Sequence, residues 1–428
     1  MPTSRMMTQA LAKDGYESRQ VSVLRRNMLD SGGSLRFSWK DGGLFLLIFA
    51  CWLADSLQQM IKYFHGLIGI GVLAGACSIA VVLFAVRWVQ SRHDGKIHWA
   101  WFAAFWIVMV ILYAVLYPIA QRHVFGVGSD REDGLRNASL QLLHFHFPYY
   151  VRSYLGNLIS PLPGALILAA PFALLGRVSL QNFVWLGAFI FFCVKFFRLR
   201  CTALAYLVVI VLAGAGALND FVDGGDFVLN LFYICVTVFA FLRTFEENNV
   251  GWRHILAGIL LGIALSSRTV FVVVLPLILA YLAQHGKGTK SALRSFALPI
   301  LVAAAVTVPI YLYDPRNFTP LHVATKLNAV PIPPEFRSFL LILLPTLALI
   351  VASLGFFLQL TMPRLFLLAG LASAVILFTP SLIMMVQNPF SSQCLGLINY
   401  SETASMLTAL WAFYRFEGAS HDASTVRI

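Results

Sequence analysis

Charged residues are scarce in this 428-residue chain, where they make up 12% of the sequence. Soluble domains carry roughly twice that share, about 25%, so the chain lacks the charge that covers the surface of a soluble enzyme or keeps a disordered chain in solution. None of the six cysteines belongs to a CxxC pair. Six cysteines in 428 residues are too few for a disulfide scaffold, and the absence of CxxC pairs favours buried apolar cysteines over metal or redox roles.

Hydrophobic residues, by contrast, make up 59% of the chain, and the mean hydropathy is +0.78. Such a composition suits helices that cross a bilayer, because a helix satisfies its own backbone hydrogen bonds in lipid. We therefore predict an all-α, polytopic integral membrane protein.

Acids are scarcer than bases, with 19 Asp and Glu against 31 Lys and Arg. In a membrane protein this excess usually reflects Lys and Arg held in cytoplasmic loops. We therefore expect membrane lipids as partners and no nucleic acid.

The apolar runs divide the chain into a cytoplasmic basic tail over 1–42, an integral membrane domain over 43–416 and a short polar tail over 417–428. A spanning helix needs about 20 mostly apolar residues, and we expect about 10–12 membrane segments in all. Two apolar stretches, 161–177 and 254–283, are ambiguous. The clear candidates are 44–62, 66–90, 98–118, 178–197, 203–219, 228–243, 297–313, 338–361, 365–386 and 401–416.

The positions of Lys and Arg indicate how the two ambiguous stretches run, taking the N-terminus as cytoplasmic. If 161–177 enters the membrane and returns on the same side, the basic cluster over 195–200 stays in the cytoplasm. The stretch 254–283 is likewise expected to form an interrupted hairpin with its turn at Ser266-Ser267-Arg268. The basic residues that precede and follow it then both stay in the cytoplasm. A tilted, ordinary span over 161–177 is the alternative.

The large outer loop that results, 119–160, holds three acids in four residues: Asp130, Glu132 and Asp133. A carboxylate near a membrane face can act as a general base toward a sugar or alcohol hydroxyl when burial and neighbours tune its pKa. Asp130 and Asp133 could instead bind a cation, because they share a face if the segment is helical. A solvated loop of paired charges is the third interpretation.

A short helix is expected in the same loop. From Leu135 to Leu143 the pattern is that of an amphipathic helix lying on the membrane surface, and Pro148 ends it. His144 and His146 lack the i, i+4 spacing of a helical metal pair, so we interpret them as structural or interfacial residues.

Two patches of the chain carry a family resemblance. In the first, the acidic loop leads through the short helix to Pro148-Tyr149 and then to Ser-Pro-Leu-Pro-Gly over 160–164. In the second, a glycine-rich apolar helix over 257–265 leads into Ser266-Ser267-Arg268. These patches resemble glycosyltransferases of the GT-C class, and most of all the polyprenyl-phosphate-mannose-dependent mannosyltransferases and their uncharacterised bacterial relatives. The chain departs from them in the spans 44–62 and 66–90, which precede the acidic loop in addition to 98–118, and in lacking an aromatic residue after the first acid.

The resemblance implies a membrane glycosyltransferase. Such an enzyme takes a sugar, here expected to be mannose, from a polyprenyl-phosphate carrier and passes it to a lipid, glycan or protein hydroxyl at the outer membrane face. In that family an acid of the first large outer loop faces the active site and precedes a Pro-Tyr. Asp130 and Asp133 precede Pro148 by 18 and 15 residues, so both are candidate catalytic residues. A bacterial cytoplasmic membrane is the implied location.

A lipid-phosphate donor needs a cation at the level of the headgroups. From residue 254 to Arg268 a helix rises about 21 Å, two thirds of a roughly 30 Å hydrocarbon core, which places Arg268 in the outer half of the bilayer. An unpaired arginine there is costly and usually functional. An ion pair with Asp55 is the structural alternative. Arg136 and Lys326, the latter in a proline-rich outer loop, are further candidate donor-phosphate-binding residues.

Other interpretations stay open at this stage. Residues 219–226 hold three acids that either cap helix ends or bind a divalent cation, so no cofactor is assigned and a divalent cation remains an alternative. A multi-pass transporter or lipid flippase is the second function, because interrupted apolar segments also mark transporter sites. An assembly protein whose outer loops bind only partners is the third.

Overall fold

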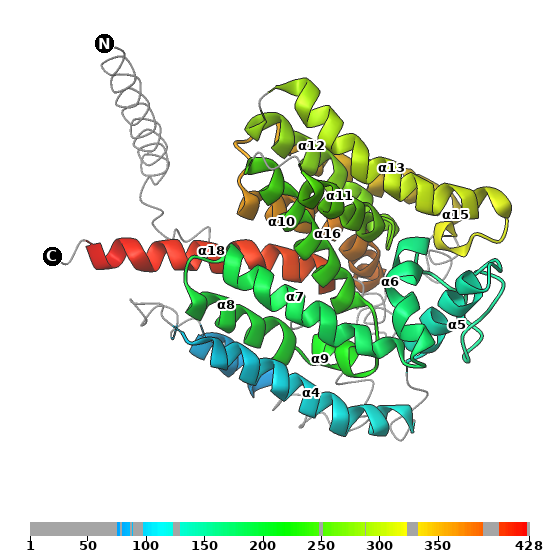
Figure 1. The fold of residues 1–428 in the computed structure, drawn as a ribbon, viewed down its shortest axis with the longest axis horizontal. Coiled ribbons are helices and arrows are strands. Elements are labelled where there is room, and N and C mark those ends of the chain that lie inside the picture. The colour runs from blue at the N-terminus through cyan, green and yellow to red at the C-terminus, as the bar shows by residue number, and fades with distance from the viewer. Residues whose placement is uncertain are drawn as a thin grey trace, which may run out of the picture.

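The computed structural model describes residues 75–77, 79–85, 88, 97–122, 129–247, 251–286, 288–322, 333–387 and 402–425. Within these residues the regular elements are helices, and the β-type pairing is confined to an isolated bridge between Arg152 and Leu158. Six of these helices are long and apolar enough to cross a membrane, or seven if one bent pair counts as a span. The predicted all-α, polytopic membrane architecture is confirmed (Figure 1).

Most of the described helices follow the predicted apolar runs, with ends shifted by a few residues. The run 203–219 is instead broken by a bend of 74° between 200–212 and 215–222, and 66–90 lies only partly within the described residues. The predicted run 401–416 lies in α18, which is long but is not among the six apolar helices, and 44–62 lies outside the described residues. The elements are α4 (Trp99–Gln121), α5 (Arg131–Leu143), α6 (Pro163–Leu174), η1 (Val178–Leu180), α7 (Gln181–Phe196), α8 (Arg200–Leu207), η2 (Val208–Leu212), α9 (Ala215–Val222), α10 (Phe227–Glu246), α11 (Trp252–Leu265), η3 (Thr269–Val273), α12 (Val274–His285), α13 (Thr289–Tyr313), η4 (Thr319–Leu321), α15 (Pro334–Ser353), η5 (Leu354–Phe356), α16 (Met362–Gln387) and α18 (Glu402–Thr425).

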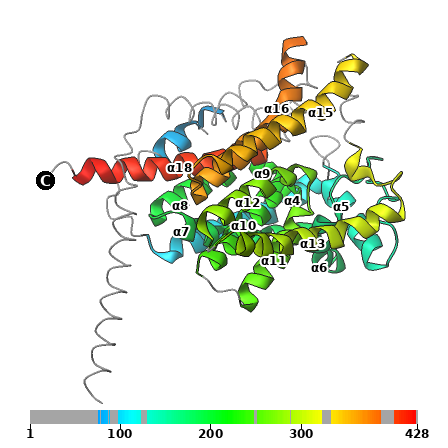
Figure 2. The ribbon, with the colours of Figure 1, turned by 90° about the horizontal axis from the view of Figure 1, so that it is seen from above.

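The bundle has two chemically different ends, which lie about 30 Å apart along the 20 residues of α10. At the start of α10, Asp226 contacts Arg268, and we call this the acidic end. At the C-terminus of α10, Glu246 accepts a hydrogen bond from Tyr281, which lies near the C-terminus of α12. We call this the basic end. Figures 1 and 2 both show α5 and α6 at one end of the bundle and the C-terminal part of α18 at the other.

The basic end collects the cations that end or begin the long helices. The helices α7, α10 and α12 end here, and α11 and α13 begin here. The tilted ring contact between His254 and Phe245 and the cavity shared by α7, α10, α12, α16 and α18 show this arrangement. The bases of this end are Lys195, Arg198, Arg243, Arg253, Lys290 and Arg294. Arginines also lie at the acidic end, among them Arg131, Arg177 and Arg268, so the two ends differ mainly in their carboxylates.

The short helix α6 does not run along the bundle. Its 12 residues rise only about 18 Å, less than a bilayer core. At its start, the amide of Gly164 donates to the carbonyl of Ser266 over 2.8 Å. Beyond its finish, Arg177 packs on the ring of Tyr117, whose hydroxyl donates to Glu132. Both ends of α6 therefore lie at the acidic end, an arrangement that matches a segment that does not cross.

The stretch 254–283 is interrupted where the sequence indicates, at Ser266-Ser267-Arg268. α11 runs parallel to α13: Gly262 lies against Pro299, and the hydroxyls of Ser266 and Thr307 are 2.7 Å apart. A Cβ at Gly262 would lie 2.6 Å from the carbonyl oxygen of Pro299, so only glycine permits this approach. Since α12 leads directly into α13, α11 and α12 form a hairpin whose turn lies at the acidic end.

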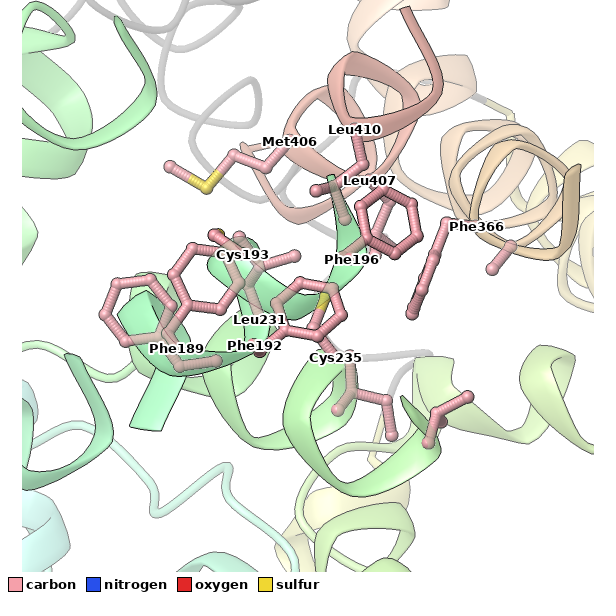
Figure 3. Packing of buried hydrophobic residues seen from close by; sticks show 14 of the residues in the cluster. Phe189, Phe192, Cys193, Phe196, Leu231, Cys235, Phe366, Met406, Leu407 and Leu410 are labelled. Atoms are coloured by element: carbon pink, nitrogen blue, oxygen red, sulfur yellow. The ribbon is translucent and has the colours of Figure 1, made fainter. Parts of the chain in front are cut away.

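Aromatic packing between α7, α10, α16 and α18 forms the centre of the bundle. Phe189 and Phe232 stack with ring centroids 4.4 Å apart, and Phe192 packs edge to face on Phe366. Figure 3 shows the phenylalanines of α7 beside Leu231 of α10, Phe366 of α16 and three residues of α18. Cys193, Cys201 and Cys235 are buried and free, as expected for apolar fillers. This rigid core holds α7 and α10, whose starts form the acidic end.

Candidate functional site at the acidic end

Two arginine–aspartate ion pairs flank the ring of Phe227. Arg131, in the first turn of α5, places Nη1 2.6 Å from Oδ1 of Asp220, and Arg268 pairs with Asp226. The guanidinium carbon of Arg131 lies 3.6 Å from the ring centroid of Phe227, and that of Arg268 lies 5.6 Å from it. Both cations are therefore held by a carboxylate and an aromatic face, although they come from distant parts of the chain.

Asp220 also caps α10. Its Oδ2 accepts hydrogen bonds from the amides of Phe227 and Val228 at 2.9 and 3.0 Å, which satisfies two of the free N–H groups of a helix start. Gly224 has φ +72°, and a Cβ at Gly225 would lie 1.9 Å from Oδ1 of Asp220, so glycine is required at both positions. The acidic loop 219–226 thus serves as a helix cap, one of its two predicted roles.

The second predicted role of that loop, a divalent-cation site, finds no support in the described part of the chain. Within it, no group of three or more His, Cys, Asp or Glu side chains is placed to hold a metal ion. Two of the three acids of the loop are instead neutralised by Arg131 and Arg268, bases that lie far away in the sequence.

The surroundings of Arg268 and Asp226 contain unused hydrogen-bonding capacity. Arg268 Nη1 donates to Oγ of Ser160 over 3.1 Å, but its Nε and Oδ1 of Asp226 are buried without a hydrogen-bond partner. One and two turns further along α10, Oδ1 of Asn230 and the hydroxyl of Tyr233 are also buried and unpartnered. Buried polar atoms normally find a partner, so these four atoms mark a place where water or a polar ligand group would be bound.

The two candidate catalytic acids have different surroundings. Asp130 directly precedes α5, and its Oδ2 accepts hydrogen bonds from the hydroxyl of Ser153 and, over 2.8 Å, from Nδ2 of Asn157. Asp133, one turn later, accepts from the amide of Tyr154 over 2.8 Å and from the side chain of Asn137 over 3.1 Å. Asp130 is thus held by two side chains of one loop, whereas Asp133 anchors the backbone of that loop.

The third acid of the cluster, Glu132, is structural. It is 7% exposed, and its carboxylate accepts hydrogen bonds from the hydroxyl of Tyr117 at 2.9 Å, the side chain of Gln121 at 3.4 Å and the amide of Ser179 at 3.0 Å. These contacts dock the start of α5 onto α4 and η1. Because its oxygens are occupied, Glu132 is not free to accept a proton from a substrate.

One segment, 153–160, joins the candidate base to the candidate phosphate-binding residue. Ser153 and Asn157 bind Asp130, and Ser160 accepts from Arg268. The hydroxyl of Tyr149 donates to the carbonyl of Pro161 over 3.0 Å and fixes the end of the segment. The structure therefore brings Asp130 and Arg268 to the same end of the bundle, 138 positions apart in the sequence.

Two tyrosines beside this segment stay protonated. Burial raises the pKa of Tyr149 well above its ordinary value, although the charge of nearby Arg268 opposes the shift. Partial burial, followed by the charges of Asp130, Asp223 and Asp133, raises the pKa of Tyr154. Tyr154 is 49% exposed and can donate a hydrogen bond beside three carboxylates.

The remaining predicted residues do not join this cluster. Arg136 is exposed on α5, away from the face that packs on α6, and makes no hydrogen bond or ion pair with the described residues. Lys326 and Asp55 lie outside the described residues. Arg268 does form an ion pair with an acid, as its structural alternative expected, but the partner in the described part of the chain is Asp226, brought there by packing of the hairpin turn on α10.

Sequence reasoning did not identify Arg131, Asp220, Asp226, Tyr154 and Phe227 as parts of the cluster. The adjacent glycines Gly224 and Gly225 were the local sequence feature that pointed to this cluster, because paired glycines indicate a tight turn. Comparison of the chain with protein-family models, curated proteins and solved structures finds no match in any of the three. The function must therefore be argued from the acidic end itself.

Proposed function

We propose that the acidic end is the active site of a membrane glycosyltransferase that uses a polyprenyl-phosphate sugar as donor. The observation that carries this proposal is the joining of Asp130 and Arg268 by the segment 153–160. A general base and a cation for a leaving phosphate are the two groups that sugar transfer from a lipid phosphate requires.

Asp130 is proposed to accept the proton of the acceptor hydroxyl. The hydroxyl oxygen then forms a bond to the anomeric carbon of the sugar, while the bond from that carbon to the phosphate oxygen breaks. The departing polyprenyl phosphate keeps the electron pair, and Arg268 compensates its charge. The hydrogen bonds from Ser153 and Asn157 occupy one oxygen of Asp130 and orient the other.

Arg268 is suited to this role by its unused donor. The side chain of Arg268 is 14% exposed and is ion-paired with Asp226. A donor phosphate would therefore bind a guanidinium that is already held in position by a carboxylate. The buried Nε has no hydrogen-bond partner among the described residues and could donate to a phosphate oxygen. Arg131, on the other side of Phe227, is a second cation within the same cluster.

The charges at the two ends of the bundle support a proposed orientation of the chain. Arginines lie at both ends, but the dense basic clusters, Lys195 with Arg198 and Arg200, and Lys290 with Arg294, lie at the basic end. Such clusters are usually retained on the cytoplasmic side. We therefore propose that the basic end and the N-terminus face the cytoplasm and that the acidic end faces outward, in a bacterial cytoplasmic membrane. A sugar donor and acceptor would then meet at the outer face.

A transporter or lipid flippase is the second candidate. One observation favours it: the segments 200–212 and 215–222 meet at a bend of 74°, so the bundle holds a second interrupted helix besides the hairpin over 252–285. Both interruptions lie toward the acidic end, whereas interrupted helices of transporters place their site near the midplane. This position favours the transferase.

Turnover of a lipid-linked sugar by the purified chain separates the two functions. A transferase releases polyprenyl phosphate and forms a new glycosidic bond in detergent solution, without any membrane gradient. A transporter moves its substrate across sealed vesicles and leaves it chemically unchanged. Transport without any glycosidic product would replace the proposed function with the second candidate.

A further inference from the structure

A cavity of about 480 Å³ opens at the basic end, about 30 Å from the acidic end. Five helices enclose it: α7, α10, α12, α16 and α18. Its wall combines aromatic and aliphatic side chains with a small number of charged groups, the composition of a site for an amphipathic molecule.

The carboxylates of the cavity are already occupied. Arg243 binds Glu246 over 3.2 Å and Glu247 over 3.1 Å, and Glu246 also accepts from the hydroxyl of Tyr281. Lys195, in the last turn of α7, lines the same cavity and has no carboxylate within ion-pair distance among the described residues. The ammonium group of Lys195 is thus available to an external anion.

A further cation lies at the rim. The guanidinium of Arg198 lies 5.5 Å from the ring centroid of Tyr414, which lines the cavity. The three nearby carboxylates are occupied, Glu246 and Glu247 by Arg243 and the buried Glu417 by the amides of Arg198 and Leu199. Lys195 and Arg198 are exposed. The exposed cations therefore favour binding of an anion over binding of a neutral or cationic group.

The apolar wall indicates what kind of anion would bind. Phe191, which is 56% exposed on α7, lies 5.6 Å from the ammonium group of Lys195, and Phe239 and Met362 continue the apolar surface into the cavity. A free phosphate would satisfy the cations and leave this surface unused. A phospholipid satisfies both, with its phosphate at the cations and an acyl chain against the aromatic wall.

We propose that this cavity binds the headgroup of an anionic phospholipid, with Lys195 as the principal contact to its phosphate. Basic pockets between transmembrane helices are recurrent sites for anionic lipid headgroups. The site is separate from the proposed sugar-transfer centre and does not depend on it, since no residue is shared between the two.

The proposal is tested with the full chain purified in detergent. Its melting temperature is followed during titration with phosphatidylglycerol, phosphatidylcholine or inorganic phosphate, for the wild type and for Lys195→Gln, Lys195→Arg and Arg294→Gln. Arg294 is the matched control, because it is an exposed cation of the same end that does not line the cavity.

We expect phosphatidylglycerol to stabilise the wild type and phosphatidylcholine to do so much less. Lys195→Gln should weaken the apparent affinity for phosphatidylglycerol roughly fivefold, the factor that corresponds to about 1 kcal/mol per basic residue near an anionic membrane surface. Lys195→Arg should retain most of the affinity and thereby show that the Gln variant lost charge and not its fold. Arg294→Gln should titrate like the wild type.

Three results would overturn the proposal. Equal losses in Lys195→Gln and Arg294→Gln would indicate diffuse attraction to the whole basic end. Equal stabilisation by the two lipids would indicate that the phosphate charge is not recognised. Equal stabilisation by inorganic phosphate would indicate a site for a soluble anion and not for a lipid.

Discussion

Arg268, at the turn between α11 and α12, is ion-paired with Asp226, the residue immediately before α10. The two side chains are 14% and 3% exposed, so the pair ties the hairpin turn to the start of α10 in a largely desolvated setting. Removing one partner of such a pair leaves an uncompensated buried charge, which typically costs about 3–5 kcal/mol. The pair therefore fixes the geometry of the acidic end, and the proposed donor site uses a cation that is already held in place.

Substitution of the two partners separates a structural role from donor binding. Arg268→Gln and Asp226→Asn should each lower the free energy of unfolding in detergent, and the double variant should recover part of the loss. If Arg268 binds the donor phosphate, Arg268→Gln also weakens donor binding per folded molecule, whereas Asp226→Asn retains it. Arg268→Lys should keep partial activity, because lysine still supplies a point charge. Donor binding that is unchanged in both single variants would make the pair purely structural.

Gly164 should tolerate no side chain. A Cβ at this position would lie 2.1 Å from the carbonyl oxygen of Ile263 and 2.6 Å from the backbone of Ser266, and neither backbone can move without disturbing the hairpin turn. We expect Gly164→Ala to lower the free energy of unfolding by about 1–3 kcal/mol, as overpacking does. Gly187→Ala is the control, since its Cβ would approach only Trp106, at 4.0 Å. Equal melting temperatures of the two variants would mean that α6 does not contact the turn this closely.

Glu417 should make stability depend on pH. Burial raises its pKa to about 7, although the amides of Arg198 and Leu199 donate to it and oppose the shift. Between its ordinary pKa of about 4.5 and about 7, the folded state holds a proton that the unfolded state has released, so stability falls as pH rises through this window. Above pH 7 the loss is complete, at up to about 3 kcal/mol.

Melting temperatures measured from pH 5 to pH 8 test this dependence. Glu417→Gln should flatten the curve, whereas Glu247→Gln, at a position 52% exposed, should leave it unchanged. A pH dependence that is the same in the wild type and in Glu417→Gln would contradict the assignment to Glu417.

The proposed orientation predicts which surface positions are reached from outside the cell. In a variant whose native cysteines are replaced, a cysteine at Arg136 should react with a membrane-impermeant maleimide in intact cells, and one at Lys290 should react only after lysis. Both positions are exposed, at opposite ends of the bundle. The reverse labelling pattern would mean that the acidic end faces the cytoplasm. Labelling of both cysteines in intact cells would contradict the placement of the acidic and basic ends on opposite sides of the membrane.

The pattern of apolar residues along the sequence predicted where the helices form, but it did not predict which side chains pair between them. Long apolar runs determine where helices form in a membrane protein, so α4, α7, α10 and α16 were found within a few residues. The interruption at Ser266-Ser267-Arg268 was also predicted. Two hydroxyls and a charge break the apolar pattern there, and the basic residues on both flanks of 254–283 require a hairpin. The helix α5 begins earlier than predicted, at Arg131, since the apolar pattern ignores the acids that favour a helix start.

The ion pairs could not be predicted because they depend on packing. Arg131 and Asp220 lie 89 positions apart, and Arg268 and Asp226 lie 42 apart. No spacing rule joins such residues, and each acid has several bases at comparable separations. Only the docking of α5 and of the hairpin turn on the start of α10 selects the partners. The contacts of Ser153 and Asn157 with Asp130 depend on how the loop after α5 folds back on its start, and no sequence motif indicated them.

Transfer of a sugar from a radiolabelled polyprenyl-phosphate donor by the purified chain is the most direct test of the proposed function. The wild type should release polyprenyl phosphate, and Asp130→Asn should lose turnover by a factor of about 10²–10⁴ while it still binds the donor, as expected for removal of a general base. Asp133→Asn, which disturbs a loop anchor, should lose less and regain activity at lower temperature. No turnover by the wild type with a range of polyprenyl-phosphate sugars, or equal and mild losses in both variants, would contradict the assignment of the acidic end as a sugar-transfer site.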